Sequence, residues 1–355
     1  HFAFSTLLSK FETSDCLRRV HAKCEILEKR AAFRTEFSKS LLLSEFNSSQ
    51  KAALKDLSEY LSNDWAQTIT QEIQETLRDV GKGGFKLDET NNAIYQMSKL
   101  CRFFAQVNFQ MSDALKFMQM RSIESYVEMV IAACNDAAAR PLFSIDLVVH
   151  PDGTLAFRAG QEPVKFASAV LGAFDNCIET LGRIKKVEWR VMDGLFWSYE
   201  PVISTLRFGV DNRGEPLFAT RLRARLEEKI TSCEEPVQEC LRSFDVHLPF
   251  LKRSMEEEME ELMAQYTDED DDVEIADAVE GIAAKAREHK ALHAAALVDV
   301  PMTTHVRAFW VKSGELRNEL ASKHERFYDE LIKMLVDLSR EQADKAHGAY
   351  GELIA

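Results

Sequence analysis

Apolar residues recur at steps of three and four positions along most of the chain, which is the period of one helix face. The clearest stripe lies between Ser49 and Gly81, and its members are Leu54, Leu57, Leu61, Trp65, Ile69, Ile73, Leu77 and Val80. Ser48 or Ser49 can cap the start of this helix, and the run Gly81–Gly84 can end it. The pattern predicts a helix over 49–80 with a length of about 48 Å.

Comparable stripes predict further helices down the chain. They span roughly 88–139, 162–184, 219–230, 236–266 with a break at Pro249, 273–292 and 313–346. The chain has only 14 glycines and 8 prolines in 355 residues, and this scarcity favours long helices because both residue types break them. We therefore expect an all-α fold of elongated antiparallel bundles with a single interruption.

The interruption is a β-hairpin at about 142–158. Its flanks are rich in β-branched and aromatic residues, and Pro151, Asp152 and Gly153 form the turn between them. The alternation places Ile145, Leu147 and Val149 on one face, which we expect to pack on helices because a lone hairpin is only marginally stable in water. The residues of this structural hairpin are Phe143, Ile145, Leu147, Val149, Pro151, Asp152, Gly153 and Phe157.

The predicted elements divide the chain into five parts, since the length exceeds what one core usually spans. These are an N-terminal bundle (1–140), the hairpin insert (141–160), a second bundle (161–266), an acidic loop with an Ala-rich helix (267–299), and a C-terminal helical segment (300–355).

The net charge is −14, and the imbalance is local. Between Met255 and Ala284 there are thirteen acidic residues and no Lys or Arg, which leaves a charge of −1 for the rest of the chain. Nucleic acids and anionic membranes require a basic face, so neither is expected as the main partner. No apolar run approaches the roughly 20 residues of a membrane span.

The seven cysteines follow no regular spacing and include no CxxC pair. This usage fits a reducing compartment, so a cytoplasmic location is expected. The first residue is His1 and no signal peptide is visible, so we expect a piece of a longer chain.

The acidic stretch allows two interpretations, a solvated loop or a patch that docks a basic accessory chain. The docking residues would be Glu256, Glu257, Glu258, Asp268, Asp270, Asp271 and Asp272. A calcium site is not expected, because the run lacks the alternating ligands, central Gly and final Glu of an EF-hand loop.

The sequence contains no motif that predicts catalysis, cofactor binding or metal binding. The glycines of Gly81–Gly84 do not form a phosphate loop, because no GxxxxGK[ST] pattern is present. His289 and His293 have a zinc-compatible spacing, but Lys290 occupies the position of the general base and no third ligand is evident. Nucleophile signatures are also absent, so no catalytic, cofactor-binding or metal-binding residue is expected.

Two segments of the chain resemble the tail of axonemal dynein heavy chains. The first runs from Ser125 to Ile184 and contains a helix end at Arg140-Pro-Leu-Phe143, the hairpin, and a helix that includes Asn176-Cys-Ile178. The second contains Val300-Pro-Met302, Phe309-Trp-Val311 and Lys323-His-Glu325, and is similar to the approach to the linker of those chains.

The resemblance implies a mechanical role in the stem of a microtubule motor. It implies partners among other dynein heavy chains, intermediate and light chains and docking proteins, within a ciliary or flagellar axoneme. The ATP-hydrolysing AAA+ modules would lie outside this segment. The alternative is a helical scaffold of another family, such as a rod or a tethering-complex subunit, which would have less need of a hairpin. A third class, a di-metal bundle enzyme, would need Glu-x-x-His pairs, and none is present.

Overall fold

The computed structural model describes residues 11–81, 91–135, 140–150, 154–185, 187, 203, 205–247, 255–267 and 275–354. Contacts within the chain group it into two compact units. The first consists of His1–Ala138 and Val164–Ser232, and the second of Ala139–Pro163 and Cys233–Ala355. The hairpin segment therefore belongs to the same unit as the C-terminal third of the chain. The finer division into five parts stays a prediction.

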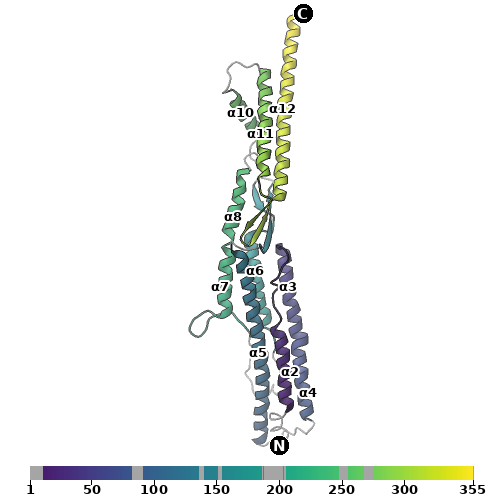
Figure 1. The fold of residues 1–355 in the computed structure, drawn as a ribbon, viewed down its shortest axis with the longest axis vertical. Coiled ribbons are helices and arrows are strands. Elements are labelled where there is room, and N and C mark those ends of the chain that lie inside the picture. Colours follow the sequence, from purple (N-terminus) through teal and green to yellow (C-terminus); the bar gives the residue numbers. More distant parts are fainter. Residues whose placement is uncertain are drawn as a thin grey trace. The chain divides into compact units, whose positions relative to one another are not determined.

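The first unit is helical, which confirms the periodicity (Figure 1). Its helical elements are α2 (Phe11–Glu28), α3 (Leu43–Glu59), the π-helical turn η1 (Tyr60–Trp65), α4 (Ala66–Gly81), α5 (Asn91–Cys134), α6 (Pro163–Leu181) and α7 (Phe218–Thr231). Helix α2 packs against both α4 and α5, and α7 packs against α5.

The predicted helix over 49–80 is a composite of three elements. It begins earlier, at Leu43, where the Glu45 carboxylate accepts a hydrogen bond from the Leu42 amide at 3.0 Å. The π-helical turn η1 then interrupts it at Tyr60–Trp65. The sequence did not predict α2, because two of the four positions in its buried stripe, Cys16 and Cys24, are small thiols beside Val20 and Leu27.

Aromatic side chains fill the core of the first unit. Tyr126 of α5 is fully buried, stacks on Phe33 at a centroid distance of 4.2 Å, and donates a 2.9 Å hydrogen bond to the Val170 carbonyl of α6. Other large buried rings in the described part of this unit include Phe46, Trp65, Phe103, Phe104, Phe166 and Phe174. This packing is what holds the long helices in place, because most helical stability comes from burial of an apolar face.

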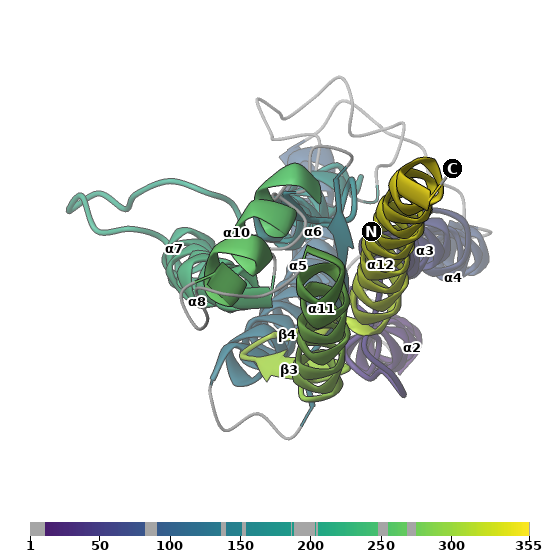
Figure 2. The same ribbon diagram turned by 90° about the horizontal axis from the view of Figure 1, so that it is seen from above.

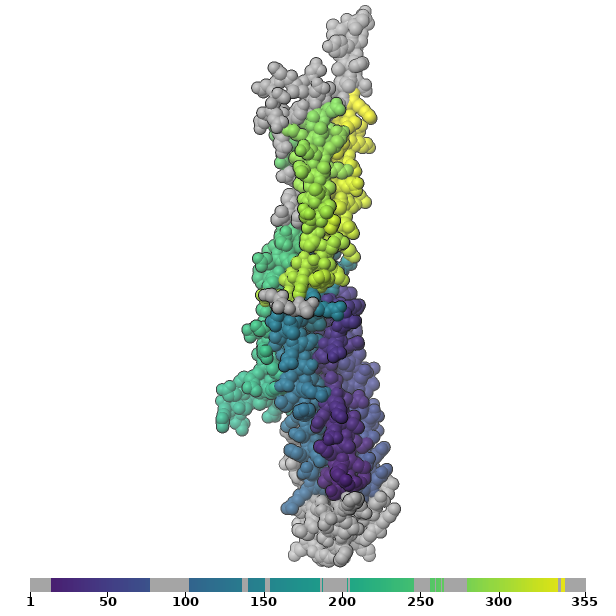
Figure 3. Space-filling view, viewed as in Figure 1, coloured from purple at the N-terminus to yellow at the C-terminus, as the bar shows by residue number. Residues whose placement is uncertain are grey.

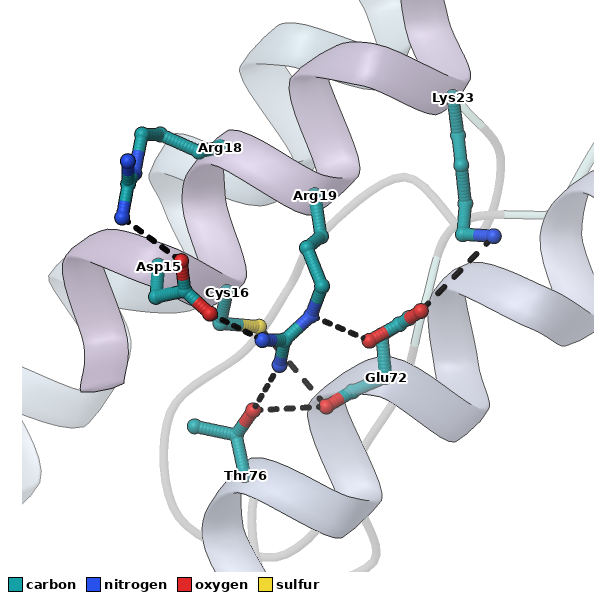
Figure 4. A network of polar contacts seen from close by, with 7 residues as sticks. All are labelled: Asp15, Cys16, Arg18, Arg19, Lys23, Glu72 and Thr76. Carbon is teal, nitrogen blue, oxygen red and sulfur yellow. Dashed lines mark hydrogen bonds and ion pairs between the residues drawn. The ribbon is translucent and has the colours of Figure 1, made fainter.

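A polar network ties α2 to α4 at the surface of the first unit (Figure 4). Glu72 of α4 accepts from the Arg19 guanidinium at 2.6 Å and lies 3.8 Å from the Lys23 ammonium. Arg19 also donates to Thr76 at 3.3 Å and pairs with Asp15 on its own helix. The Arg19 side chain is 43% exposed, so this network fixes the register of the helices more than it stabilises them.

The second unit contains a four-stranded sheet in the order β2-β1-β4-β3. Strands β1 (Phe143–Val149) and β2 (Leu155–Phe157) pair antiparallel, which confirms the hairpin. Strands β3 (Thr303–Val306) and β4 (Phe309–Lys312) form a second antiparallel pair, and β4 runs parallel to β1. The expected helical fold with a hairpin is therefore confirmed, and the structure adds a second hairpin, β3–β4, that the sequence did not predict.

The helices of the second unit are α8 (Glu234–Ser243), the 3-10 turn η2 (Phe244–His247), α10 (Met255–Thr267), α11 (Ile275–Val298) and α12 (Gly314–Ile354). Helices α11 and α12 lie side by side over a long contact (Figures 2 and 3). Helix α10 packs mainly on α11 and more lightly on α12. The break expected at Pro249 falls outside the described residues.

Candidate interaction surface

The inward side of β1 is the most completely buried part of the sheet. Phe143, Ile145 and Leu147 are fully buried, whereas Val149 is half-buried. Phe157 of β2 pairs with Leu147 and is 7% exposed. The turn residues Pro151, Asp152 and Gly153 lie outside the described residues.

The parallel pairing of β1 with β4 joins segments that are far apart in the sequence. Phe143 lies opposite Phe309 with ring centroids 5.5 Å apart, and the Phe143 amide donates to the Ala308 carbonyl at 2.9 Å. These strands come from the two segments that resemble dynein heavy chains. The two segments that carry the resemblance therefore meet in one sheet.

A short signal for β3 and β4 is present in the sequence. Thr303 to Val306 and Phe309 to Lys312 are rich in β-branched and aromatic residues and flank a two-residue connection. Arg307 in that connection has a φ of 49°, which is uncommon for a residue other than glycine. The connection contains no Gly, Asn or Asp, so the usual hairpin-turn signal is missing.

Polar contacts hold the end of the sheet to the start of α12. Arg158, which follows β2, donates its backbone amide to the Asp146 carbonyl at 2.9 Å and pairs its side chain with Glu315. The Asp146 amide in turn donates to the Gln161 side-chain oxygen at 2.7 Å. These bonds satisfy backbone groups of β1 that would otherwise lack partners on that side.

The acidic residues of α10 divide between its two faces. Glu256, Glu257, Glu260 and Glu261 are exposed, whereas Glu258 is only 3% exposed. Glu258 lies one helical turn before the buried Leu262, so it faces the neighbouring helices. Of the expected docking residues on the described part of α10, Glu256 and Glu257 are exposed and Glu258 is buried. The other expected members, Asp268, Asp270, Asp271 and Asp272, lie outside the described residues.

The buried Glu258 carboxylate links all three helices of this bundle. It accepts a 2.8 Å hydrogen bond from the Tyr328 hydroxyl of α12, and His289 Nδ1 of α11 lies 3.6 Å away. The sequence shows Glu258 as one acid in an acidic run, and it did not single out Tyr328. The spacing of four positions between Glu258 and Leu262 was the one signal in the sequence that the two residues share a helix face.

The zinc-spaced pair His289 and His293 lies beside this carboxylate, and His324 of α12 joins it. The ring centroid of His293 is 6.4 Å from that of His289 and 5.6 Å from that of His324. Among the residues that the structure describes, no group of three or more His, Cys, Asp or Glu side chains is arranged to hold a metal ion. The contacts of Glu258, Tyr328, His289, His293 and His324 form a polar centre in the helix bundle.

Burial is the main influence on the ionisation of His324, which is 2% exposed. Burial, His293 and Lys290 together lower the pKa of His324 to about 4, and the negative charge of Glu258 only partly opposes them. The imidazole is therefore neutral at pH 7. Lys290 is itself engaged with Asp329 at 2.5 Å.

In the described part of the chain, six cysteines are free thiols, and all of them except Cys240 are buried: Cys16, Cys24, Cys134, Cys177, Cys233 and Cys240. Burial raises the pKa of both Cys24 and Cys177 to about 12, so neither is a thiolate at neutral pH. Over the same described part of the chain, no helix combines the length and the apolar character needed to cross a membrane.

The fold and this surface define a helical-bundle protein with a small mixed sheet and an acidic helix face. No known protein-family profile matches the chain. The chain is 26% identical over 267 residues to dynein axonemal heavy chain 1 of Homo sapiens, and 25% identical over 268 residues to that of Mus musculus. Each match covers 70% of this chain, and the match to the protein of Rattus norvegicus covers 67% at 26% identity.

These comparisons confirm the resemblance to axonemal dynein heavy chains in general. The matched region covers about 6% of the length of these relatives. The relationship supports a dynein-related role in general.

Proposed function

We propose that this chain is a structural and interaction segment of a dynein heavy-chain tail. In this role it holds heavy chains and accessory chains together and anchors the motor to its cargo or to a doublet microtubule. The observation that carries the proposal is the pairing of β1 with β4, because it unites the two segments that resemble the tail in one sheet. Similarity to axonemal heavy chains over 70% of the chain supports the same assignment.

The proposed partners are other dynein heavy chains, intermediate and light chains, and docking proteins of the cilium or flagellum. Neither a nucleic acid nor a membrane is proposed. In this account the segment itself performs no catalysis, and ATP hydrolysis belongs to another part of the longer motor chain.

We further propose that the exposed acidic face of α10 docks a basic accessory chain. Four glutamates on 13 residues repel one another at spacings of three and four positions. Glu257 and Glu261 also take part in other interactions, so Glu256 and Glu260 are the better test positions. A basic partner surface would relieve the repulsion and would make the complex sensitive to salt.

The test is charge reversal in the full heavy chain. Glu256→Lys with Glu260→Lys should leave folding nearly unchanged and should weaken capture of intermediate and light chains from axonemal extract at low salt. The matched control is Glu124→Lys with Glu128→Lys, an exposed pair with the same spacing on α5. Equal capture by both double variants would contradict the docking proposal.

A further inference from the structure

A polar centre lies where α10 meets the α11–α12 pair. On its apolar side, Leu262 of α10 packs into a buried cluster with Ile282, Ala283 and Ala286 of α11 and with Tyr328, Leu331 and Leu335 of α12. On its polar side, Glu258 of α10 accepts from Tyr328 and lies beside His289. Among the described side chains of α10, these two are the ones fully buried against the other helices.

His324 lies directly under this contact. Its ring centroid is 4.7 Å from that of Tyr328, the residue that binds Glu258, and 5.6 Å from that of His293. The charged and titratable groups that act on it are Glu258 from α10 and Lys290 and His293 from α11. His289 of α11 lies next to Glu258 and His293. A proton on His324 would place a positive charge in a buried site next to other cationic groups, at a high cost in free energy.

We propose that Glu258, Tyr328 and His324 form a proton-sensitive latch that holds α10 on the α11–α12 pair and releases it on acidification. The neutral imidazole packs against the Tyr328 ring, and the Tyr328 hydroxyl stays aligned on the Glu258 carboxylate. The imidazolium is favoured by contact with water, and separation of α10 from the pair opens this site to water. This inference does not depend on the proposed tail function.

The direction of the pH effect follows from the depressed pKa of His324. In the unfolded chain the imidazole titrates near 6.5, whereas in the folded bundle its pKa is about 4. The latch is therefore fully stable above pH 6.5 and weakens as the pH falls from 6.5 toward 4. Over the interval from pH 7.5 to 4.5, the closed-to-open ratio should fall on the order of fiftyfold.

The test is hydrogen exchange of the 355-residue chain at pH 7.5, 6.5, 5.5 and 4.5, with protection corrected for the intrinsic exchange rate. Protection of the α10 amides should fall on the order of fiftyfold in the wild type, and His324→Gln should abolish most of this dependence. His21→Gln is the control, because His21 is an exposed histidine on α2. It should keep the full wild-type dependence, and the α2–α5 amides report any general unfolding.

Three outcomes would overturn the proposal. They are a wild-type α10 whose protection does not change with pH, a His324→Gln variant that keeps the wild-type dependence, and a loss of dependence in Glu258→Gln alone. The last outcome would identify the carboxylate as the sensor in place of the imidazole. If His324→Gln does not fold at pH 7.5, His324→Phe tests the same point, because it keeps an aromatic ring without a titratable nitrogen.

Discussion

Two buried tyrosines bind acceptors of different charge. Tyr126 donates to the neutral Val170 carbonyl, whereas Tyr328 donates to the Glu258 carboxylate, and both side chains are fully buried. A hydrogen bond to a charged group contributes more to stability than one to a neutral group. The contribution of the Tyr328–Glu258 hydrogen bond to stability can therefore be compared with that of the Tyr126–Val170 bond in the same protein.

We expect Tyr328→Phe to reduce the stability of the α10–α12 bundle by about 1.5–3 kcal/mol, because it removes a donor from a buried carboxylate. Tyr126→Phe should cost the first unit only about 0.5–1.5 kcal/mol. Hydrogen exchange resolved by helix measures the loss of stability in each variant. A smaller loss at Tyr328 than at Tyr126 would show that the Glu258 carboxylate is satisfied without that bond.

Leu147 tests the buried face of β1. Leu147→Asp places an unpaired carboxylate at a fully buried position, so we expect a loss of several kcal/mol of stability in the second unit. His150→Asp adds the same charge at an exposed position three residues away and should change stability little. Thermal unfolding followed by circular dichroism compares the two variants, and an unchanged midpoint for Leu147→Asp would show that this face is accessible to water.

At the scale of elements, helices were more predictable than strand pairing. The periodicity located α5, α6, α7 and α12 because a long helix repeats its apolar stripe over several turns. Strands β3 and β4 have four residues each, which is too short for a clear alternation. The pairing of β1 with β4 is set by tertiary packing, which no local pattern records.

The candidate surface was predictable only in part, for a related reason. Composition identified the acidic run, but which of its residues face solvent depends on the helices that pack against α10. Glu258 has the same side chain as Glu257, yet it is buried because it shares a face with Leu262. The partnership of His324 with His293 likewise arises from the packing of α11 on α12.

The central position of β4 leads to a prediction about cooperativity between the two hairpins. Val311 is fully buried and pairs with Ile145 of β1 on one side and Thr304 of β3 on the other. Val311→Asp should therefore expose the amides of β1 as well as those of β3, with protection lost across Phe143–Val149. Lys312→Asp is the control at an exposed position of the same strand. Normal protection of β1 in Val311→Asp would contradict the coupling.

At the scale of the whole molecule, a helical first unit is combined with a second unit in which a mixed sheet and an antiparallel helix pair share one body. The similarity to axonemal dynein heavy chains extends into both units of this chain, since the matched length exceeds that of either unit alone. The described surfaces suit protein contacts, with acidic residues on α10 and large apolar residues such as Phe109 and Phe117 exposed on α5. Both features motivate the assembly role proposed above.

The central claim is that this chain contacts accessory subunits as part of a dynein heavy-chain tail. Chemical cross-linking of intact axonemes through lysines, read by mass spectrometry, tests it directly in the native assembly. The account predicts cross-links from lysines of this segment, such as Lys116, Lys285 and Lys333, to intermediate chains, light chains or a second heavy chain. Cross-links from these lysines that reach only the motor modules of the same heavy chain, while accessory chains link to other parts of it, would contradict the account.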